Sequence, residues 1–148
     1  MIVDFHHVSI SVRDIDRSVA FYKDILGFEF MFERDIVNDY VGKIVGYPDM
    51  HMRLVFLRAG GEKLELIQYL SPQGTPVETE NCNPGVSHFA MEVDDIHAMY
   101  KHLQAHGIRT RSEPVLMTKG PHKGGYSMYV YDPDGVTIEM MQMVAATD

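Results

Sequence analysis

The sequence predicts an α+β protein built from two tandem βαβββ modules. Three observations carry this prediction: a turn and strand near the C-terminus, a second copy of that stretch in the first half, and matching segments at the start of each half. A repeat of this length decides the architecture before any single element is assigned. The 148 residues are expected to form one domain, with modules over about 1–70 and 85–148 joined by a linker over 71–84.

The stretch from Asp132 to Gln142 is typical of a tight turn that leads into a strand. Asp-Pro-Asp-Gly combines a preset φ, a side chain that can bond its own backbone and a glycine that tolerates positive φ. From Val136 onward the residues alternate with the period of a strand. Glu139 lies well inside this strand, where an unpaired carboxylate is costly. One such glutamate considered alone would indicate little.

The first half contains a twin of this stretch. Residues 61–68, Gly-Glu-Lys-Leu-Glu-Leu-Ile-Gln, align with residues 135–142, so that Glu65 lies on Glu139. Residues 7–15 likewise align with residues 88–96, which places His7 on His88. Each half therefore contributes one histidine from its first strand and one glutamate from its last.

Local patterns supply the remaining elements. In the first half we expect a strand over 3–12, a helix over about 15–26 capped by Asp14 and Gly27, a strand over 28–34, and a hairpin of strands 51–58 and 63–70. In the second half we expect strands over 86–93, 108–117, 126–131 and 136–143, a helix over about 95–106, and a loop over 119–125. The loop 35–50 is too apolar for solvent alone, and is either a pocket wall or lid, or a short packed helix.

Charge and composition narrow the range of partners. With 21 acidic and 13 basic residues the net charge is −8, which argues against nucleic acid, because that binding depends on Lys and Arg neutralising phosphates. No run reaches the roughly 20 apolar residues of a membrane span, and the N-terminus shows no signal-peptide pattern. The single Cys82 cannot form an internal disulfide. We therefore expect a cytoplasmic protein that binds neither nucleic acid nor membranes.

Alternation also predicts which face of each strand the repeated residues occupy. His7, Glu65, His88 and Glu139 alternate with apolar neighbours that would pack under the helices, so all four should share the opposite, concave face. Any one of these residues, considered alone, would more often have a structural role than bind a metal. Because the internal repeat relates all four, metal binding becomes the favoured interpretation. Two imidazoles and two carboxylates suit a divalent transition metal, whereas the carboxylates would repel each other without a cation. The sequence therefore predicts a metal site formed by these four residues.

At these residues the sequence resembles the vicinal oxygen chelate superfamily, which includes glyoxalase I, methylmalonyl-CoA epimerase, extradiol dioxygenases, and fosfomycin- and bleomycin-resistance proteins. The matching segments are 7–12, 16–22, 64–66, 87–90 and 132–139, so the resemblance covers nearly the whole chain. It implies a curved mixed sheet around a metal, often completed in a homodimer. We also expect a homodimer because uncovered strand edges and the apolar loop 35–50 favour a partner.

The set of two histidines and two glutamates is similar to that of the isomerase and epimerase branch. This implies a metal-dependent isomerase, epimerase or lyase of glyoxalase type that moves a proton beside the chelated carbonyl of a small oxygenated substrate. Glu139 would be the catalytic base and Glu65 its counterpart, with Ni, Co, Zn, Mn or Fe as the metal. A non-haem iron extradiol-type dioxygenase and a resistance-type small-molecule binding protein are the alternatives.

Two positions depart from the pattern of glutathione-dependent glyoxalase I. That enzyme generally carries an Arg four residues after its first ligand His and an Asn four residues after its first Glu, where this chain has Ser11 and Tyr69. The departure argues against glutathione. For coenzyme A, the sequence offers only Arg53, Lys119 and Lys123 as an evident cationic cradle.

Overall fold

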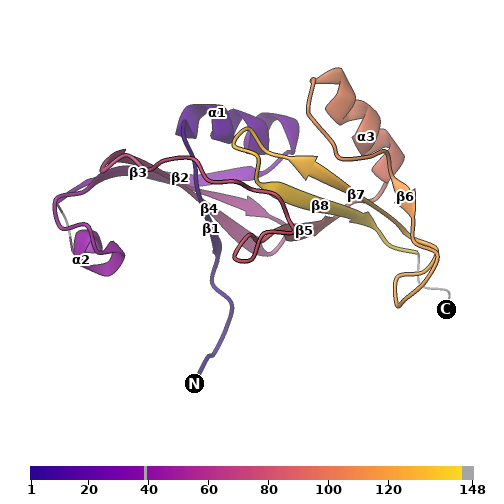
Figure 1. Cartoon of the computed structure of the whole chain (residues 1–148), viewed down its shortest axis with the longest axis horizontal. Helices are drawn as coiled ribbons and strands as arrows, with labels where there is room; N and C mark the ends of the chain where they lie inside the picture. The colour runs from indigo at the N-terminus through magenta and orange to yellow at the C-terminus, as the bar shows by residue number, and fades with distance from the viewer. Residues whose placement is uncertain (39, 145–148) are drawn as a thin grey trace. The chain divides into compact units, whose positions relative to one another are not determined.

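The computed structural model describes residues 1–38 and 40–144, arranged as two compact units, Met1–Pro76 and Val77–Asp148 (Figure 1). The division falls inside the predicted linker 71–84. Asp39 of the predicted loop and the predicted module end at 148 lie outside the described residues. Each unit contains one four-stranded mixed sheet. None of the helices in the described ranges is long and apolar enough to span a membrane.

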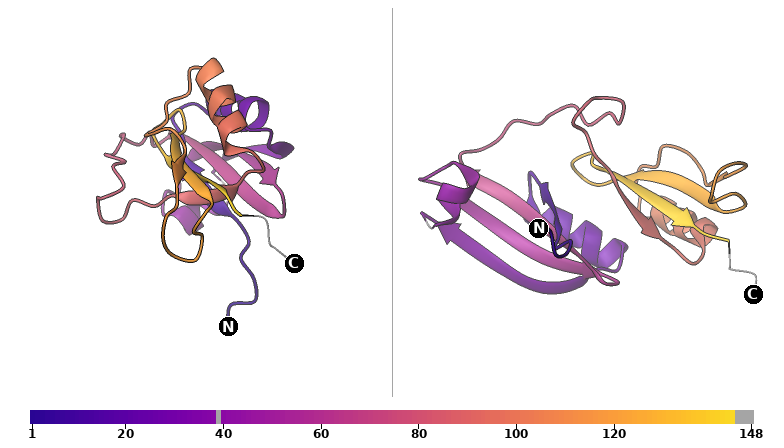
Figure 2. Two further views of the ribbon diagram at one scale, coloured as in Figure 1. Left: turned by 90° about the vertical axis from the view of Figure 1, so that its right-hand side faces the viewer. Right: turned by 90° about the horizontal axis from the view of Figure 1, so that it is seen from below.

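In the first unit the strand order is β1–β4–β3–β2. The strands are β1 (Val8–Ser11), β2 (Glu29–Val37), β3 (His51–Ala59) and β4 (Glu62–Ser71), and only the β1–β4 pair is parallel. Helix α1 (Ile15–Val19) continues as the π-helical segment η1 (Ala20–Ile25) on one side of the sheet, and α2 (Val41–Val45) lies on the other side (Figure 1). The long strands of this sheet are twisted and curved (Figure 2).

The second unit repeats this plan with the order β5–β8–β7–β6. Its elements are β5 (Phe89–Glu92), α3 (Ile96–Ala105), β6 (Val115–Leu116), β7 (Tyr126–Tyr131) and β8 (Thr137–Gln142). The first strand is again parallel to the last, while β7 is antiparallel to both of its neighbours. The prediction of two tandem βαβββ modules is confirmed.

The repeat has a structural cause at the start of each helix. Asp14 and Asp95 cap α1 and α3, because each side chain accepts a backbone N–H, at 3.0 and 2.9 Å. The repeated glutamines Gln68 and Gln142 accept the first helical N–H, at 3.1 and 3.0 Å. Each last strand is thereby tied to the helix of its own unit, and N–H groups that the helix itself cannot satisfy gain partners.

The main core of each unit lies between the helix and the sheet. The residues that alternate with Glu65 and Glu139 are among the most buried of the chain. Together with apolar side chains of the helices and neighbouring strands, they form the core. Its members include Ile15, Tyr22, Val55, Leu57, Leu64 and Leu66 in the first unit, and Ile96, Leu103, Met128, Val130, Ile138 and Met140 in the second. The predicted helix-facing sets are therefore the buried sets.

A second apolar cluster lies in the first unit, on the face covered by α2. Its buried members are Ile36, Met50, Met52, Leu54 and Phe56, and the α2 residues Val41 and Val45 pack against them. Of the two alternatives for the loop 35–50, the structure shows the short packed helix.

Several predicted boundaries were wrong. The strand predicted over 3–12 covers only 8–11, and that over 86–93 covers only 89–92, since parallel pairing begins at Val8↔Leu64 and Phe89↔Ile138. The strand predicted over 28–34 extends to Val37. The strand predicted over 108–117 is reduced to an isolated bridge at Thr110 and the two residues of β6, because Pro114 lacks the N–H needed for a continuous ladder.

Candidate functional site

The turn that precedes β8 positions Glu139. Asp132 is buried, and its Oδ1 accepts the backbone N–H groups of Asp134 and Val136, each at 2.8 Å. Gly135 has a φ of 88°, which a side chain would disfavour. The turn thus fixes where β8 begins. Alternation along β8 then directs Glu139 away from the face on which α3 packs.

In the second unit Glu139 is paired with His88. His88 Nε2 lies 3.4 Å from Glu139 Oε2, and the Ser127 hydroxyl donates to Glu139 Oε1 at 2.8 Å. Tyr129 lies opposite Glu139 in the β7–β8 ladder, and its ring centroid is 5.3 Å from that of His88. Both oxygens of the carboxylate are therefore engaged, one by the imidazole and one by the hydroxyl.

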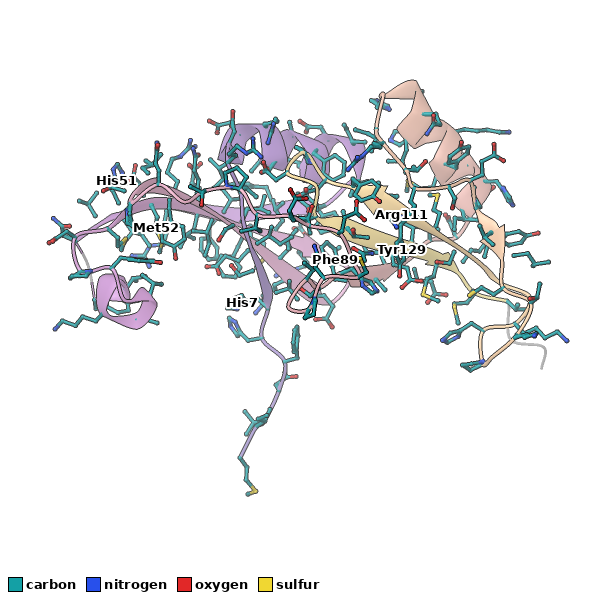
Figure 3. All side chains as sticks on the ribbon, viewed as in Figure 1. His7, His51, Met52, Phe89, Arg111 and Tyr129 are labelled. Carbon is teal, nitrogen blue, oxygen red and sulfur yellow. The ribbon has the colours of Figure 1, made fainter. Side chains whose placement is uncertain are left out.

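The first unit contains the equivalent pair. His7 Nε2 lies 3.3 Å from Glu65 Oε2, and the Glu65 side chain is only 13% exposed. The His7 ring meets Phe56 edge-on at 5.3 Å, and its Nδ1 lies 2.6 Å from Nδ1 of His6 (His7 is labelled in Figure 3). Phe56 lies opposite Glu65 in the ladder, as Tyr129 lies opposite Glu139. The two pairs therefore match in partner, separation and aromatic neighbour.

Each pair has the separation expected of two ligands on one ion. Ligand atoms about 2.1 Å from a metal ion lie roughly 3.0 Å apart at a right angle and about 3.4 Å apart in a tetrahedron. The observed N–O separations of 3.3 and 3.4 Å fit this range. Within residues 1–38 and 40–144 the structure brings these residues together as pairs, and it contains no group of three or more His, Cys, Asp or Glu that could hold a metal ion.

A cavity of about 360 Å³ opens beside Glu139 within the second unit. Its walls are partly polar, from Arg111, Ser127 and Tyr129, and partly apolar, from Val115, Leu116 and Met117. A volume of this size suits a small organic ligand. The carboxylate of one His–Glu pair is therefore exposed to a ligand-sized space.

Arg111 is the cation in this cavity wall, and its position is well defined. Its Nε donates to the Tyr131 hydroxyl at 2.6 Å and its Nη2 to Glu80 at 2.5 Å. These two bonds, that of Tyr131 first, raise the pKa of the Arg111 guanidinium. Arg109 stacks on the same tyrosine, with its guanidinium carbon 3.9 Å from the centre of the Tyr131 ring.

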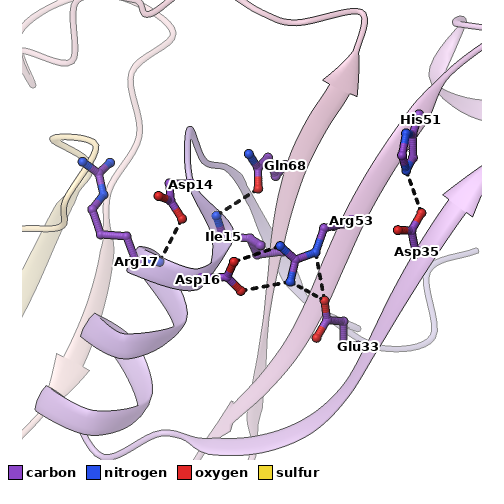
Figure 4. Close-up of polar contacts among 9 residues, drawn as sticks. All are labelled: Asp14, Ile15, Asp16, Arg17, Glu33, Asp35, His51, Arg53 and Gln68. Carbon is purple, nitrogen blue, oxygen red and sulfur yellow. Dashed lines mark hydrogen bonds and ion pairs between the residues drawn. The ribbon is translucent and has the colours of Figure 1, made fainter.

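Arg53, one of the three residues suggested as a coenzyme A cradle, is bound to two carboxylates of its own unit. The Arg53 guanidinium bonds both oxygens of Asp16, at 3.0 and 2.9 Å, and Oε1 of Glu33, at 3.0 and 2.6 Å (Figure 4). The bond to Arg53 holds the pKa of Asp16 below its usual value. Arg53 therefore links α1 to β2 and β3 on the face opposite Glu65, and its donors are already occupied by two carboxylates.

Tyr69 shares the face of Glu65, four residues along β4. Its ring meets that of Tyr47 edge-on at 5.9 Å. Burial raises the pKa of the Tyr69 hydroxyl, and nearby Tyr47 and Glu65 add to this effect. The hydroxyl consequently stays protonated at neutral pH, at one of the two positions that depart from the pattern of glutathione-dependent glyoxalase I.

Sequence reasoning missed Ser127, Tyr129 and Arg111. The signal for the first two was present in Tyr-Ser-Met-Tyr-Val-Tyr of β7, where the buried Met128 and Val130 alternate with residues that must face Glu139. Arg111 gave a weaker signal, because the segment that carries it forms only one bridge with β7.

Known proteins resemble this chain over nearly its whole length. Residues 4–140 match the family model of the glyoxalase/bleomycin resistance protein/dioxygenase superfamily. A 2-epi-5-epi-valiolone epimerase of Actinomyces sp. is 29% identical over 97% of this chain and 81% of its own length. Human mitochondrial methylmalonyl-CoA epimerase is 32% identical over 93% of this chain and 72% of its own. A lactoylglutathione lyase of Arabidopsis thaliana is 31% identical over 93% of this chain, which spans 44% of that relative.

Solved structures show the same fold. A glyoxalase family protein from Bacillus cereus has a TM-score of 0.85 at 17% identity, with 98% of this chain and 97% of that chain covered. A fosfomycin resistance protein from Listeria monocytogenes, solved with Mn(II) and sulfate, has a TM-score of 0.67 at 18% identity, with 98% and 96% covered. Family match, relatives and fold lead to one conclusion: this chain belongs to the glyoxalase/bleomycin resistance protein/dioxygenase superfamily.

Proposed function

We propose that the chain is a divalent-metal-dependent isomerase, epimerase or lyase of glyoxalase type, which moves a proton beside the carbonyl of a small oxygenated substrate. The observation that carries the proposal is the duplicated pair, His7 with Glu65 and His88 with Glu139, at almost equal separations. Of the three relatives described above, two are epimerases and one is a lyase, and the proposed reaction class follows theirs.

The four paired side chains are the proposed metal ligands. Their donor atoms, two imidazole nitrogens and two carboxylate oxygens, suit Ni, Co, Zn, Mn or Fe. A divalent ion held there would supply Lewis acidity to the substrate oxygens. A cation would also offset the negative charge that Glu65 and Glu139 carry on largely shielded side chains, which are 13% and 21% exposed.

Glu139 is the proposed base, because it borders the cavity and can reach a substrate that occupies it. Ser127 holds one carboxylate oxygen, so the other oxygen, Oε2, which faces His88, would loosen from the metal to take the proton. Glu65 is the proposed counterpart that returns a proton, in keeping with the repeat. Oxidative chemistry of the dioxygenase type is less well supported, since Glu65 would be a fourth protein ligand where such an iron site usually has three.

A homodimer of the chain in the cytoplasm completes the proposal. Apolar side chains on and beside α2 are exposed, with Tyr40, Ile44 and Tyr47 at 62%, 74% and 48%. Exposed apolar groups gathered on and beside one short helix favour a protein partner, and closed twofold dimers are the commonest assembly.

The test is solvent deuterium exchange on metal-loaded protein. Wild-type protein should incorporate deuterium at the acidic carbon of a 2-oxo acid, a 2-hydroxy acid or an acyl thioester. Glu139→Gln keeps the size of the side chain but removes its basicity, so turnover should fall about 10²- to 10⁴-fold while the metal is largely retained. Oxygen consumption with catechols serves as the control for the dioxygenase alternative.

Two results would count against the proposal. Undiminished exchange in Glu139→Gln would remove Glu139 from the role of base. No exchange by the wild type with any of the three substrate classes would favour the dioxygenase or the binding protein, and the metal content of protein purified without added metal would then separate those two.

A further inference from the structure

Arg111 is a cation in a cavity that is otherwise lined by neutral and apolar groups and by Glu139. We propose that Arg111 binds a carboxylate of the substrate, so that the ligand of this cavity is a small organic acid. This inference rests on the proposed function, because it names the substrate class of the same site. Nothing in the repeat predicts it, since Arg111 has no counterpart among the duplicated residues.

The position of Arg111 follows from the ladder. The bridge between Thr110 and Val130 turns Thr110 toward the buried face, so Arg111 points to the opposite face, which Glu139 shares. Its backbone N–H donates to the Tyr129 carbonyl at 2.8 Å, which fixes the segment against β7 (Arg111 and Tyr129 are labelled in Figure 3). The backbone bond thus fixes the segment that carries Arg111, and the side-chain bonds to Tyr131 and Glu80 hold its guanidinium.

Arg111 retains donors for a ligand. A guanidinium has five N–H groups, and among the described residues Tyr131 takes the one on Nε while Glu80 takes one on Nη2. The remaining donors include both N–H groups on Nη1. The bond to Tyr131 orients the guanidinium plane, which lowers the entropic cost of a two-point contact with a carboxylate.

The surroundings favour a carboxylate over a phosphate. Glu80 already neutralises part of the Arg111 charge, and the chain carries a net charge of −8, so a dianion would meet more repulsion than a monoanion. The planar fork of one arginine matches a carboxylate or a phosphate equally, so the charge of the surroundings is what favours the carboxylate. Val115, Leu116 and Met117 supply an apolar wall for a short hydrocarbon part of the ligand. A 2-oxo or 2-hydroxy acid with a short side chain meets all three conditions.

The experiment uses the full chain, freed of metal, and two probes of equal shape: 2-hydroxybutyrate and its neutral amide, 2-hydroxybutyramide. Binding is followed by NMR through the backbone amides of Ser127, Tyr129 and Glu139. In Arg111→Gln the affinity for the acid should fall about 10- to 100-fold, the usual effect of losing a hydrogen bond to a charged group, while the amide should bind as in the wild type.

Two further variants sharpen the result. Arg109→Gln removes an equal charge from the neighbouring position that stacks on Tyr131 but does not line the cavity, and it should change the affinity for the acid by less than about threefold. Glu80→Gln removes the competing carboxylate and should strengthen binding of the acid. Inorganic phosphate, used as a third probe, should bind more weakly than the acid.

Equal affinity of wild type and Arg111→Gln for the acid overturns the inference, as does the absence of saturable binding or tighter binding of phosphate. A separate calorimetric titration with Ni²⁺ keeps the two proposals apart. If Ni²⁺ binds and the Arg111 comparison fails, only the carboxylate inference is lost. If Ni²⁺ does not bind, the proposed function fails while the NMR comparison on metal-free protein still decides the role of Arg111.

Discussion

Replacing Ser127 by alanine should weaken metal binding without unfolding the protein. The Ser127 hydroxyl donates to Oε1 of Glu139 at 2.8 Å, and this is a bond to a charged acceptor whose side chain is 21% exposed. Such a bond is worth about 1.5–3 kcal/mol, and partial exposure places it toward the lower end. At 1.4 kcal/mol for each factor of ten, a loss of about 1.5–2 kcal/mol lowers affinity roughly 10- to 30-fold.

The effect arises because Ser127 orients Glu139, a proposed metal ligand, without binding the ion itself. Without the hydroxyl, Glu139 gains rotational freedom and must be ordered when the ion binds. Groups that orient ligands in this way commonly contribute about 10- to 100-fold to metal affinity. In the first unit, Leu54 holds the position that corresponds to Ser127, two residues before the aromatic residue opposite the glutamate. The substitution therefore acts on the second pair alone.

The assay is calorimetric titration of metal-free protein with Ni²⁺, accompanied by thermal unfolding of the same samples. Ser112→Ala is the matched control, because Ser112 lines the same cavity without bonding Glu139. Equal affinities for wild type, Ser127→Ala and Ser112→Ala would refute the reasoning. So would an equal loss in both variants, since that result would point to the cavity wall rather than to the bond.

Three other predictions concern stability and assembly. Leu66→Ala removes a fully buried side chain from beneath α1 and should cost about 2–5 kcal/mol in urea unfolding; a cost below about 1 kcal/mol would contradict the assigned core. Arg53→Met should cost up to about 1 kcal/mol at neutral pH. Arg53 lowers the pKa of Asp16 below 3.8, so this stabilisation is complete above that value and is lost as pH falls through the lowered pKa. The difference in unfolding free energy between wild type and Arg53→Met should therefore shrink in acid. A difference that grows in acid would contradict the argument. Light scattering at micromolar concentration should give the mass of a dimer, and Ile44→Glu on α2 should yield a monomer, whereas a monomeric wild type would dismiss the dimer.

The strand positions of the glutamates could be predicted because alternation is strict where both neighbours are buried. Ile138 and Met140 are 0% and 1% exposed on either side of Glu139, and Leu64 and Leu66 are 4% and 0% exposed on either side of Glu65. A shift of one residue would bury the carboxylate under the helix, so the pattern permits one register only.

The histidines were harder to place. His7 and His88 precede the paired part of β1 and β5, so the ladder does not hold them directly. Their assignment came from the repeat, which pairs each with a glutamate, and the structure shows both pairs in contact. The ion pair between Arg111 and Glu80 could not be predicted from local sequence patterns. The two residues are 31 positions apart, and Glu80 lies in a segment without regular structure.

The measurement that most directly tests the central proposal is the number of metal ions bound per chain, in the wild type and in His7→Ala and His88→Ala. If the two His–Glu pairs act as ligands of one ion, the wild type should bind one Ni²⁺ per chain. Each single variant should then lose nearly all tight binding, because either substitution breaks the same site. Two ions per wild-type chain, with one retained in each variant, would contradict the account by showing two independent sites.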